Sequence, residues 1–325
     1  RNYGVAIHQG TKVTGIIKNA GRVTGVTTDA GNITAEYVVN AGGMWARDIG
    51  HMAGVAVPLH ACEHFYIVTE AMPNLTPNLP VLRVPDECAY YKEDAGKILL
   101  GAFEPNSKPW GMNGIPEDFE FDSLPEDFDH FEPILERAVD RFPMLAKVGI
   151  QTFFNGPESF TPDGTFMLGE TAETRGLFLG CGMNSVGIAS GGGAGMNLAH
   201  AIVHGAPAYD LSEADAKRFA PVFNSLDHLM ARAPEILGNH YEIAYPGKQL
   251  STARDLRPLP VDSDYRAAGA QFGQVYGWER PLYFGKTAEP KLRFDKPDWF
   301  ANVAAEVEAA HQRAAIFDAS SFGKI

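Results

Sequence analysis

Residues 176–204 read GLFLGCGMNSVGIASGGGAGMNLAHAIVH, and this stretch decides the fold. An apolar strand at 176–179 leads through a glycine-rich turn into a helix of small residues that runs to about His204. Glycine costs about 1 kcal/mol relative to alanine inside a helix, so glycines clustered at a helix start favour close approach of a ligand. The backbone amides and the dipole of such a helix suit an electron-rich group. A tightly packed helix is the alternative explanation.

These glycines do not form the G-x-G-x-x-G fingerprint of a dinucleotide site. Ser185, Met196 and Leu198 stand where the third glycine would have to be. No Lys-Ser or Lys-Thr pair follows, as a phosphate-binding loop would require. A better match is a helix N-terminus directed at a ring carbonyl that gains negative charge on reduction, as the pyrimidine edge of a flavin does.

Upstream, residues 11–39 alternate apolar and polar side chains, with turn residues at 19–21 and 29–32. This pattern predicts three short antiparallel strands, the third including Ile33 and Tyr37. An apolar strand at 37–40 is expected next. The glycine turn after it predicts a helix over 44–53.

The middle of the chain predicts a mixed or antiparallel sheet with strands at 64–68, 89–91 and 98–100. Residues 151–154 follow later, before a turn at 161–164. Ser123 and Glu126 have the spacing of a capping box, which predicts a helix that follows them and runs to about Arg141. Its core-facing residues, at helical spacing, are Phe128, Phe131, Leu135, Ala138 and Phe142.

The composition changes after Pro207. A helix-rich stretch is expected at 214–232, an irregular Pro- and Arg-rich segment at 253–283, and a last helix at 299–312. We expect a domain boundary near 206–210.

Charge and cysteine usage exclude several classes of protein. The formal net charge is −13 and no run of Lys and Arg occurs, which argues against binding to nucleic acid. The three cysteines have no metal-ligand spacing, so no metal site or disulfide framework is expected, and a reducing compartment is favoured. Apolar stretches are broken before the roughly 18 residues of a membrane span, and no targeting signal is expected at the start.

Several motifs occur in the order that they have in D-amino-acid-oxidase-type flavin domains, and together they resemble the dimethylglycine and sarcosine dehydrogenase family. These motifs are Val38-Val39-Asn40-Ala41-Gly42-Gly43-Met44-Trp45-Ala46, Glu63-His64-Phe65-Tyr66, Tyr90-Tyr91, Thr161-Pro162-Asp163-Gly164 and Gly182-Met183-Asn184-Ser185-Val186-Gly187-Ile188. Downstream, residues 277–281 (GWERP) and 316–324 (IFDASSFGK) resemble that family's linker and the opening of its glycine-cleavage T-protein-like folate domain.

The resemblance implies a mixed α/β fold. It places the second half of a glutathione-reductase-like FAD domain in residues 1–60 and 150–206, and an antiparallel substrate-binding sheet and helix in 61–149. It also implies a central linker domain in 207–270 and the opening of an aminomethyltransferase-like folate domain in 271–325. The family's N-terminal βαβ unit and most of its folate domain have no match here. We therefore expect a piece of a longer protein that is inactive alone.

The resemblance also assigns site residues. His64 and Tyr90 match the substrate-side histidine and tyrosine beside the flavin, although a packed core histidine and an ordinary strand aromatic are the alternatives. Tyr91 should face the opposite side. Trp45 has an alternative as a core tryptophan, and Asp163 is expected to shape a turn. The implied flavin contacts are Val13 on the adenine side, Ala41, Gly42 and Trp45 near phosphate and ribose, and Pro162, Met183, Asn184, Ser185, Gly187 and Ile188 near the ring.

The implied activity is FAD-dependent oxidative demethylation of dimethylglycine or sarcosine, with tetrahydrofolate taking up the one-carbon unit. An electron-transfer flavoprotein or oxygen would accept the electrons, in a bacterial cytoplasm or a mitochondrial matrix. Arg83 and Lys92 are the cations nearest in sequence for a substrate carboxylate. Two alternatives remain: a non-catalytic relative like the pyruvate dehydrogenase phosphatase regulatory subunit, and a one-carbon transferase in which the flavin region is scaffold.

Overall fold

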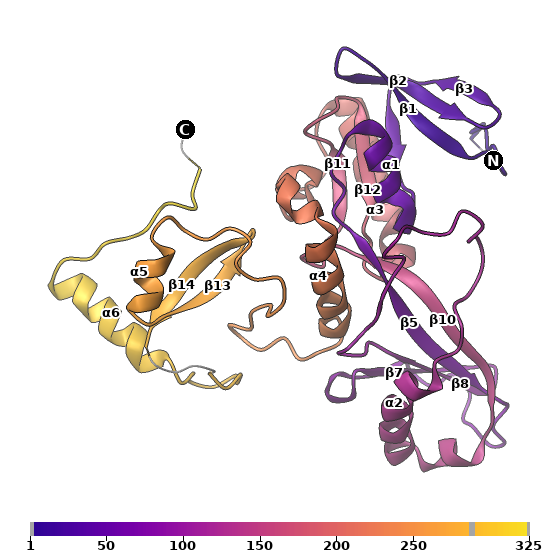
Figure 1. Cartoon of the computed structure of the whole chain (residues 1–325). Coiled ribbons are helices and arrows are strands. Elements are labelled where there is room, and N and C mark those ends of the chain that lie inside the picture. The colour runs from indigo at the N-terminus through magenta and orange to yellow at the C-terminus, as the bar shows by residue number, and fades with distance from the viewer. Residues whose placement is uncertain (1–2, 286–289, 324–325) are drawn as a thin grey trace. The chain divides into compact units, whose positions relative to one another are not determined.

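The computed structural model describes residues 3–285 and 290–323, so Lys324 of the last motif lies outside the described residues. The chain divides into two compact units, residues 1–242 and 243–325 (Figure 1). The fold is mixed α/β with several antiparallel sheets, as the sequence predicts. The predicted domain boundaries at 60, 150, 206 and 270 stay predictions.

The predicted meander is present at the start of the first unit. Strands β1 (Val13–Asn19), β2 (Arg22–Thr28) and β3 (Gly31–Thr34) pair antiparallel in that order. The third strand ends at Thr34, so the inclusion of Tyr37 in it was wrong. The ring of Tyr37 lies instead beneath the guanidinium of Arg22, 5.0 Å from its centroid.

A second, partly parallel sheet contains the stretch that opened the sequence analysis. Strand β12 (Leu177–Cys181) pairs parallel with β4 (Val38–Asn40) and antiparallel with β11 (Met167–Glu170). Strands β4 and β12 each lead into a helix through a glycine turn. After β4 come a 3-10 turn, η1 (Gly43–Trp45), and α1 (Ala46–Ala53), and after β12 comes α3 (Gly187–His204).

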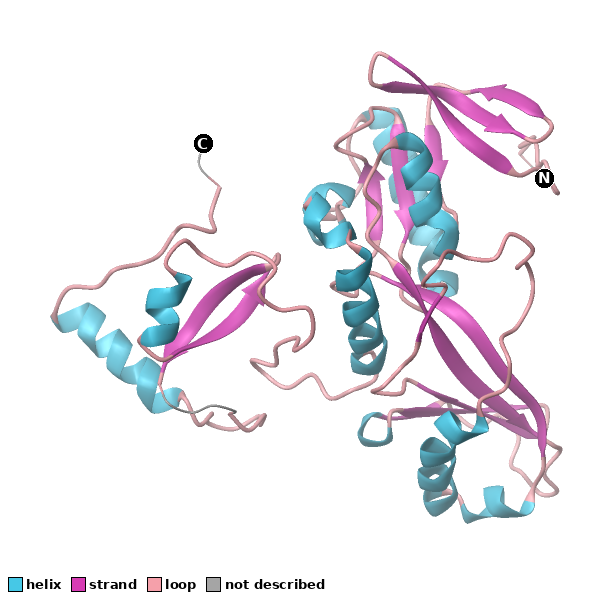
Figure 2. Ribbon diagram, viewed as in Figure 1, coloured by secondary structure: helices cyan, strands magenta, loops and turns pink. Residues whose placement is uncertain are grey.

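The largest sheet has six strands, in the order β10-β5-β8-β7-β6, with β9 paired to the other part of β5. Two of its strands, β5 and β10, are long and cross the middle of the unit side by side (Figure 2). The bounds are β5 His60–Thr69, β6 Leu82–Val84, β7 Ala89–Asp94, β8 Lys97–Ala102, β9 Pro109–Trp110 and β10 Ile150–Phe160.

Helix α2 (Phe128–Arg141) covers one face of this sheet, but the predicted capping box was wrong. The N-cap is Asp127, whose carboxylate accepts a hydrogen bond from the backbone N–H of His130 at 3.1 Å. Ser123 and Glu126 precede the helix, because the chain between them pairs elsewhere: the N–H of Leu124 donates to the carbonyl of Asn155. Of the predicted apolar stripe, Phe131 and Ala138 are buried, Leu135 and Phe142 pack against that core, and Phe128 is exposed at its edge.

Short helices fill the rest of the first unit. The predicted helix-rich stretch at 214–232 contains two 3-10 turns and the end of a third, and α4 (Leu226–Asn239) begins inside it and continues seven residues beyond it. The 3-10 elements are η2 Pro85–Glu87, η3 Pro143–Lys147, η4 Ser212–Ala214, η5 Ala216–Arg218 and η6 Pro221–Asn224.

The second unit is more regular than the sequence predicts. Residues 253–283, expected to be irregular, contain α5 (Asp262–Ala267) and most of an antiparallel hairpin of β13 (Ala270–Val275) and β14 (Trp278–Phe284). The hairpin turns at Tyr276 and Gly277, both with positive φ, so tyrosine occupies a position where asparagine or glycine is usual. The last helix, α6 (Phe300–Gln312), is confirmed.

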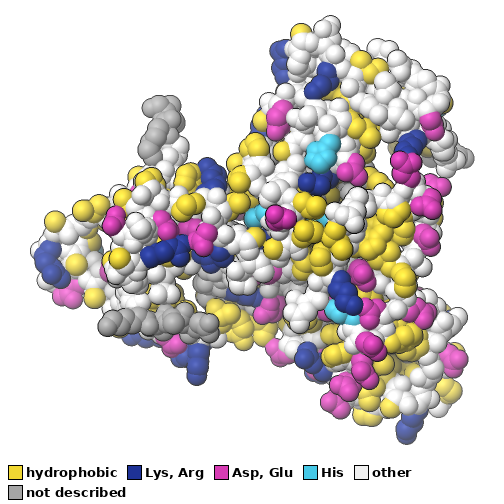
Figure 3. Space-filling view, viewed as in Figure 1, with side chains coloured by type: hydrophobic (Ala, Val, Ile, Leu, Met, Phe, Trp, Pro, Cys, Tyr) yellow, Lys and Arg dark blue, Asp and Glu magenta, His cyan; other side chains and the backbone are white. Residues whose placement is uncertain are grey.

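No helix among the described residues is long and apolar enough to cross a membrane. On the face shown in the space-filling view, Lys and Arg side chains are dispersed among acidic ones (Figure 3).

Two buried histidines make the first unit sensitive to acid. Burial, with the positive charge of Arg47, lowers the pKa of His60 from 6.5 to about 4, and burial with Arg232 lowers the pKa of His228 to about 4. Between pH 6.5 and about 4, the unfolded chain binds more protons at these histidines than the folded chain does. The free energy of unfolding is therefore unaffected by them above pH 6.5 and falls as the pH drops toward 4. We expect the Tm measured by circular dichroism to decline across this window.

Two histidine variants test whether the buried histidines cause the decline in Tm. His228→Gln is expected to flatten the decline, because one titrating group is removed, whereas His8→Gln, at an exposed position, leaves it unchanged. An equal decline in all three proteins would show that other groups control the acid response.

Candidate functional site

A cavity of about 450 Å³ lies where the large sheet meets the glycine turns. His64 on β5 and Tyr90 on β7 line it, together with Trp45 from the turn after β4 and Ser185 from the turn after β12. Four of the twelve predicted site residues are therefore brought together, although they are up to 140 positions apart in sequence. Tyr91 points away into the hydrophobic core, as strand alternation predicts.

Two glycines leave space for aromatic rings that line this cavity. Gly101 on β8 lies opposite both Tyr90 and Tyr66 in the sheet register, and a Cβ built there would lie 2.0 Å from the Tyr90 ring. Gly156 on β10 lies opposite His64, and a Cβ there would lie 2.6 Å from the ring of Phe154. The two aromatic rings therefore lie flat over backbone that has no side chain.

An aromatic cluster that the sequence analysis missed surrounds Tyr90. Tyr241, just after α4, contacts the Tyr90 ring edge-on at 5.6 Å between centroids and Phe103 at 4.2 Å. Phe103 also contacts His64 at 4.5 Å and His240 at 4.8 Å. No local signal marks these residues, because they join only when α4 ends beside the sheet.

The cavity holds polar atoms without protein partners. His64 is 7% exposed, and its Nδ1 has no hydrogen-bond partner among the described residues. Glu158, on the same face of β10 as Gly156, has a buried Oε2 in the same condition. Burial raises the pKa of Tyr90, and neighbouring Tyr241 and Glu158 act in the same direction, so the Tyr90 hydroxyl keeps its proton at neutral and moderately alkaline pH.

The turn before α3 is held by Asn184. Its backbone has φ of +47°, its Oδ1 accepts from the N–H of Thr161 at 2.9 Å, and its Nδ2 donates to the carbonyl of Gly182 at 2.6 Å. Asn184 therefore connects two predicted flavin-contact segments, the one containing Pro162 and its own. Its amide groups are engaged within the protein.

The other predicted flavin contacts are spread along the first unit. Val13 begins β1 in the meander. Gly42 precedes η1, and a Cβ there would lie 2.6 Å from Ile49. Ile188, in the first turn of α3, is fully exposed. Asp163 shapes its turn as predicted, since its carboxylate accepts from the N–H of Thr165 and pairs with Arg218.

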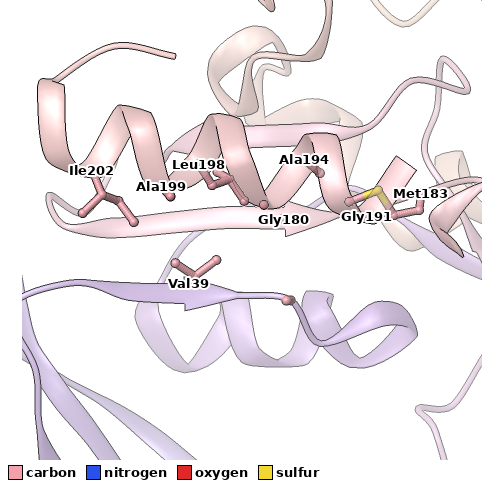
Figure 4. A pocket seen from close by; sticks show the side chains of 10 residues that line it. Val39, Gly180, Met183, Gly191, Ala194, Leu198, Ala199 and Ile202 are labelled. Carbon is pink, nitrogen blue, oxygen red and sulfur yellow. The ribbon is translucent and has the colours of Figure 1, made fainter. Parts of the chain in front are cut away.

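An apolar groove of about 400 Å³ runs along α3 (Figure 4). Side chains of α3, including Ala194, Leu198 and Ile202, face Val39 of β4 across it. The predicted contacts Ala41 and Met183 line the same groove. A flat apolar group could lie at its α3 start, where Met183 meets Gly191.

The described residues fit FAD. The first N–H groups of an α-helix lack acceptors within the helix, so the turn at Gly187 offers donors beside the exposed Ser185 and Ile188. A built Cβ at Gly191, which lines the groove, would meet nothing within 4 Å, so this position leaves space for a large flat ring. Among the described residues, no three His, Cys, Asp or Glu side chains gather as a metal would need.

Replacing Asn184 by alanine is expected to destabilise the first unit by about 2–4 kcal/mol. Two buried hydrogen bonds are lost, the N–H of Thr161 is left unpaired, and alanine at positive φ adds strain. Urea unfolding followed by fluorescence measures the change.

Asn184→Asp is the matched control. It keeps the Oδ1 acceptor and tolerates the left-handed backbone, so we expect it to recover about half of the loss. Equal stability of the alanine variant and the parent would refute the bridging role.

The fold of the first unit is similar to that of an amino-acid oxidase. Glycine oxidase from Geobacillus kaustophilus has a similar structure, with a TM-score of 0.55 and 25% identity, over 67% of this chain and 54% of that one. Residues 1–201 match the family described as FAD dependent oxidoreductase, and the chain belongs to it. Residues 204–258 match the FAD dependent oxidoreductase central domain, and residues 262–325 match the GCVT N-terminal domain.

Three curated relatives are similar along most of the chain. The 4-methylaminobutanoate oxidase (formaldehyde-forming) of Paenarthrobacter nicotinovorans is 37% identical over 98% of this chain and 38% of its own length. The mitochondrial pyruvate dehydrogenase phosphatase regulatory subunit of Mus musculus is 38% identical over 99% and 38%. Mitochondrial sarcosine dehydrogenase of Mus musculus is 35% identical over 88% and 34%. The chain thus spans less than two fifths of each relative's length. Among these relatives, enzymes that oxidise N-methyl amino acids occur.

Proposed function

We propose that the protein oxidises the N-methyl group of a small N-methylated amino acid, such as dimethylglycine or sarcosine, with FAD as cofactor. One observation carries the proposal: His64 and Tyr90 share a single cavity with Trp45 and Ser185 of the glycine turns. Similarity to an oxidase and a dehydrogenase of N-methyl amino acids supports the substrate class.

The chain's residues have distinct roles in this reaction. The substrate amine is mostly protonated near neutral pH, and only the neutral amine has the lone pair that drives loss of a hydride from the methyl carbon. His64 accepts the ammonium proton at its unpaired, buried Nδ1. Tyr90 keeps its own proton, so its hydroxyl orients the amine through a hydrogen bond.

Oxidation then forms a C=N bond from the nitrogen lone pair as the methyl C–H bond breaks, which gives an iminium cation. When bound, FAD supplies the acceptor for the hydride. The residues that would hold it are the turns at 41–45 and 183–188, and the first-turn amides of α3 offer N–H donors to a group that gains negative charge. Where no tetrahydrofolate is bound, water converts the iminium to formaldehyde, the demethylated amine and a proton.

The residues that match a GCVT domain suggest a fate for the one-carbon unit. In the full-length protein, tetrahydrofolate would capture it from the iminium. The electrons would pass to an electron-transfer flavoprotein or to oxygen, in a mitochondrial matrix or a bacterial cytoplasm.

Anaerobic titration of the full-length protein tests the proposal. We expect flavin absorbance to bleach on addition of dimethylglycine, sarcosine or 4-methylaminobutanoate, and the rate to fall at least about 10²-fold in His64→Ala and Tyr90→Phe. Tyr91→Phe, on the neighbouring core-facing position, is the control and should keep the parent rate.

A non-catalytic regulatory protein is the second candidate, favoured by 38% identity to a phosphatase regulatory subunit. If the protein binds flavin but no N-methyl amine reduces it, the catalytic proposal is refuted and the regulatory role is supported. The presence of both His64 and Tyr90 in one cavity argues for catalysis.

A further inference from the structure

We infer that the cavity at His64 and Tyr90 is a recognition site for methylated ammonium, in which Glu158 supplies the negative charge and aromatic rings contact the methyl groups. The inference rests on the proposed function for its substrate but not for its test. It adds a specificity-determining residue and a ligand class, the N-methylated cation.

The lining of the cavity has the chemistry of a cation site. Two of its side chains are acidic, Glu158 and Asp122, and no lysine or arginine is among the described residues that line it. Quaternary and methylated ammonium groups bind to aromatic faces, because the ring quadrupole attracts their charge. The aromatic lining residues are Trp45, Tyr66, Tyr90, Phe119, Phe121 and Phe154.

Strand register places Glu158 beside the reacting groups. Gly156 lies directly opposite His64, and Glu158 is two residues further along β10, on the same face of the sheet. Diagonal neighbours of this kind are roughly 7–8 Å apart at their backbones, which leaves room for one small ligand between the side chains. The ring of Phe154 covers Gly156 and forms part of the lining.

Glu158 lacks a partner of its own. Its Oε2 is buried without a hydrogen-bond partner among the described residues, and an unpaired buried carboxylate oxygen is costly unless a ligand satisfies it. Its charge already acts on this cavity, since it contributes, after burial and Tyr241, to the raised pKa of Tyr90. Asp122, by contrast, is exposed, and its Oδ1 accepts from the N–H of Ser123.

Both the substrate and the product of hydride loss carry a positive charge that an acidic residue can stabilise. The amine arrives as an ammonium cation and leaves as an iminium cation, so Glu158 faces positive charge before and after hydride loss. The described residues of the lining offer no lysine or arginine to the substrate's own carboxylate. Arg83 is engaged with the carbonyl of His240 and the ring of Tyr241, and Lys92 pairs with Asp94, so neither candidate cation lines the cavity.

Tetramethylammonium is the probe for the test, because it carries the charge and the methyl groups but has no lone pair to support oxidation. Calorimetric titration of the full-length protein is expected to show binding that weakens at least about tenfold in Glu158→Gln and stays within about threefold in Glu158→Asp. Glu126→Gln, at an exposed acid outside the lining, should change the Kd by less than about threefold.

Neutral tert-butanol, of similar size, controls for shape. It should bind the parent and Glu158→Gln equally. Unchanged affinity of tetramethylammonium in Glu158→Gln, or equal loss of both probes, would overturn the inference. Charge-dependent binding without flavin reduction by any N-methyl amine would leave the inference standing and defeat the proposed function; reduction with binding independent of Glu158 would do the reverse.

Discussion

Replacing Gly101 by alanine is expected to lower kcat/KM for N-methyl amines by about 10²-fold, close to the loss in Tyr90→Phe. The added methyl would lie 2.0 Å from the Tyr90 ring, so the ring must swing away from the cavity. Displacement of a positioning group by about 1 Å costs on the order of 10²-fold in rate. The fold should tolerate the change, because the clash is with the outer end of a side chain.

A double-mutant cycle isolates the cause. If Gly101→Ala acts by moving Tyr90, it should cost nothing further in a Tyr90→Ala background. Gly149→Ala is the matched control, since its methyl would lie 2.9 Å from the exposed carboxyl of Glu70, away from the cavity. Full activity in Gly101→Ala would show that the position of Tyr90 is unimportant for the reaction.

Replacing Glu279 by alanine is expected to destabilise the second unit by about 3 kcal/mol. Glu279 is fully buried and receives hydrogen bonds from Arg254, the N–H of Asp255 and Gln274. Burial raises its pKa, but these hydrogen bonds and the charge of Arg254 outweigh burial and hold the pKa below its ordinary value. Removing the carboxylate leaves a largely buried guanidinium without its counter-charge, which is more costly than losing an exposed ion pair.

Limited proteolysis across 243–323, with urea unfolding, measures this effect. We expect cleavage in Glu279→Ala at urea concentrations where the parent resists. Asp295→Asn removes an ion pair to Arg293 whose side chains are 77% and 34% exposed, and should change stability by less than about 1 kcal/mol. Similar resistance to proteolysis in Glu279→Ala and Asp295→Asn would show that the buried ion pair does not stabilise the second unit.

Much of the fold could be read from local pattern. Alternation and turn residues predicted the meander, β4, β5, β7, β8 and β12, and small-residue spacing predicted α3. Errors arose where a local rule had a competitor. Ser123 and Glu126 have capping-box spacing, yet Asp127 is the N-cap. Tyr276-Gly277 forms a tight hairpin turn without the usual asparagine, so the hairpin of the second unit was missed.

Some residues of the candidate site were predicted from the sequence and others were not. The motif order pointed to His64, Tyr90, Trp45 and Ser185, which line one cavity. Nothing local pointed to Gly101, Glu158 or Tyr241. Strand alternation says which face a side chain takes, but not which residue lies opposite it.

The sequence by itself determined most elements of the first unit, their order and the family, because periodicity, turn chemistry and motif order are properties of neighbouring residues. Only the tertiary structure decided that Tyr90 lies over Gly101, that Glu158 joins His64 around one cavity, and that Asn184 connects two turns. Those contacts depend on strand register and on the end of α4 beside the sheet. Both are set by packing between segments far apart in the chain.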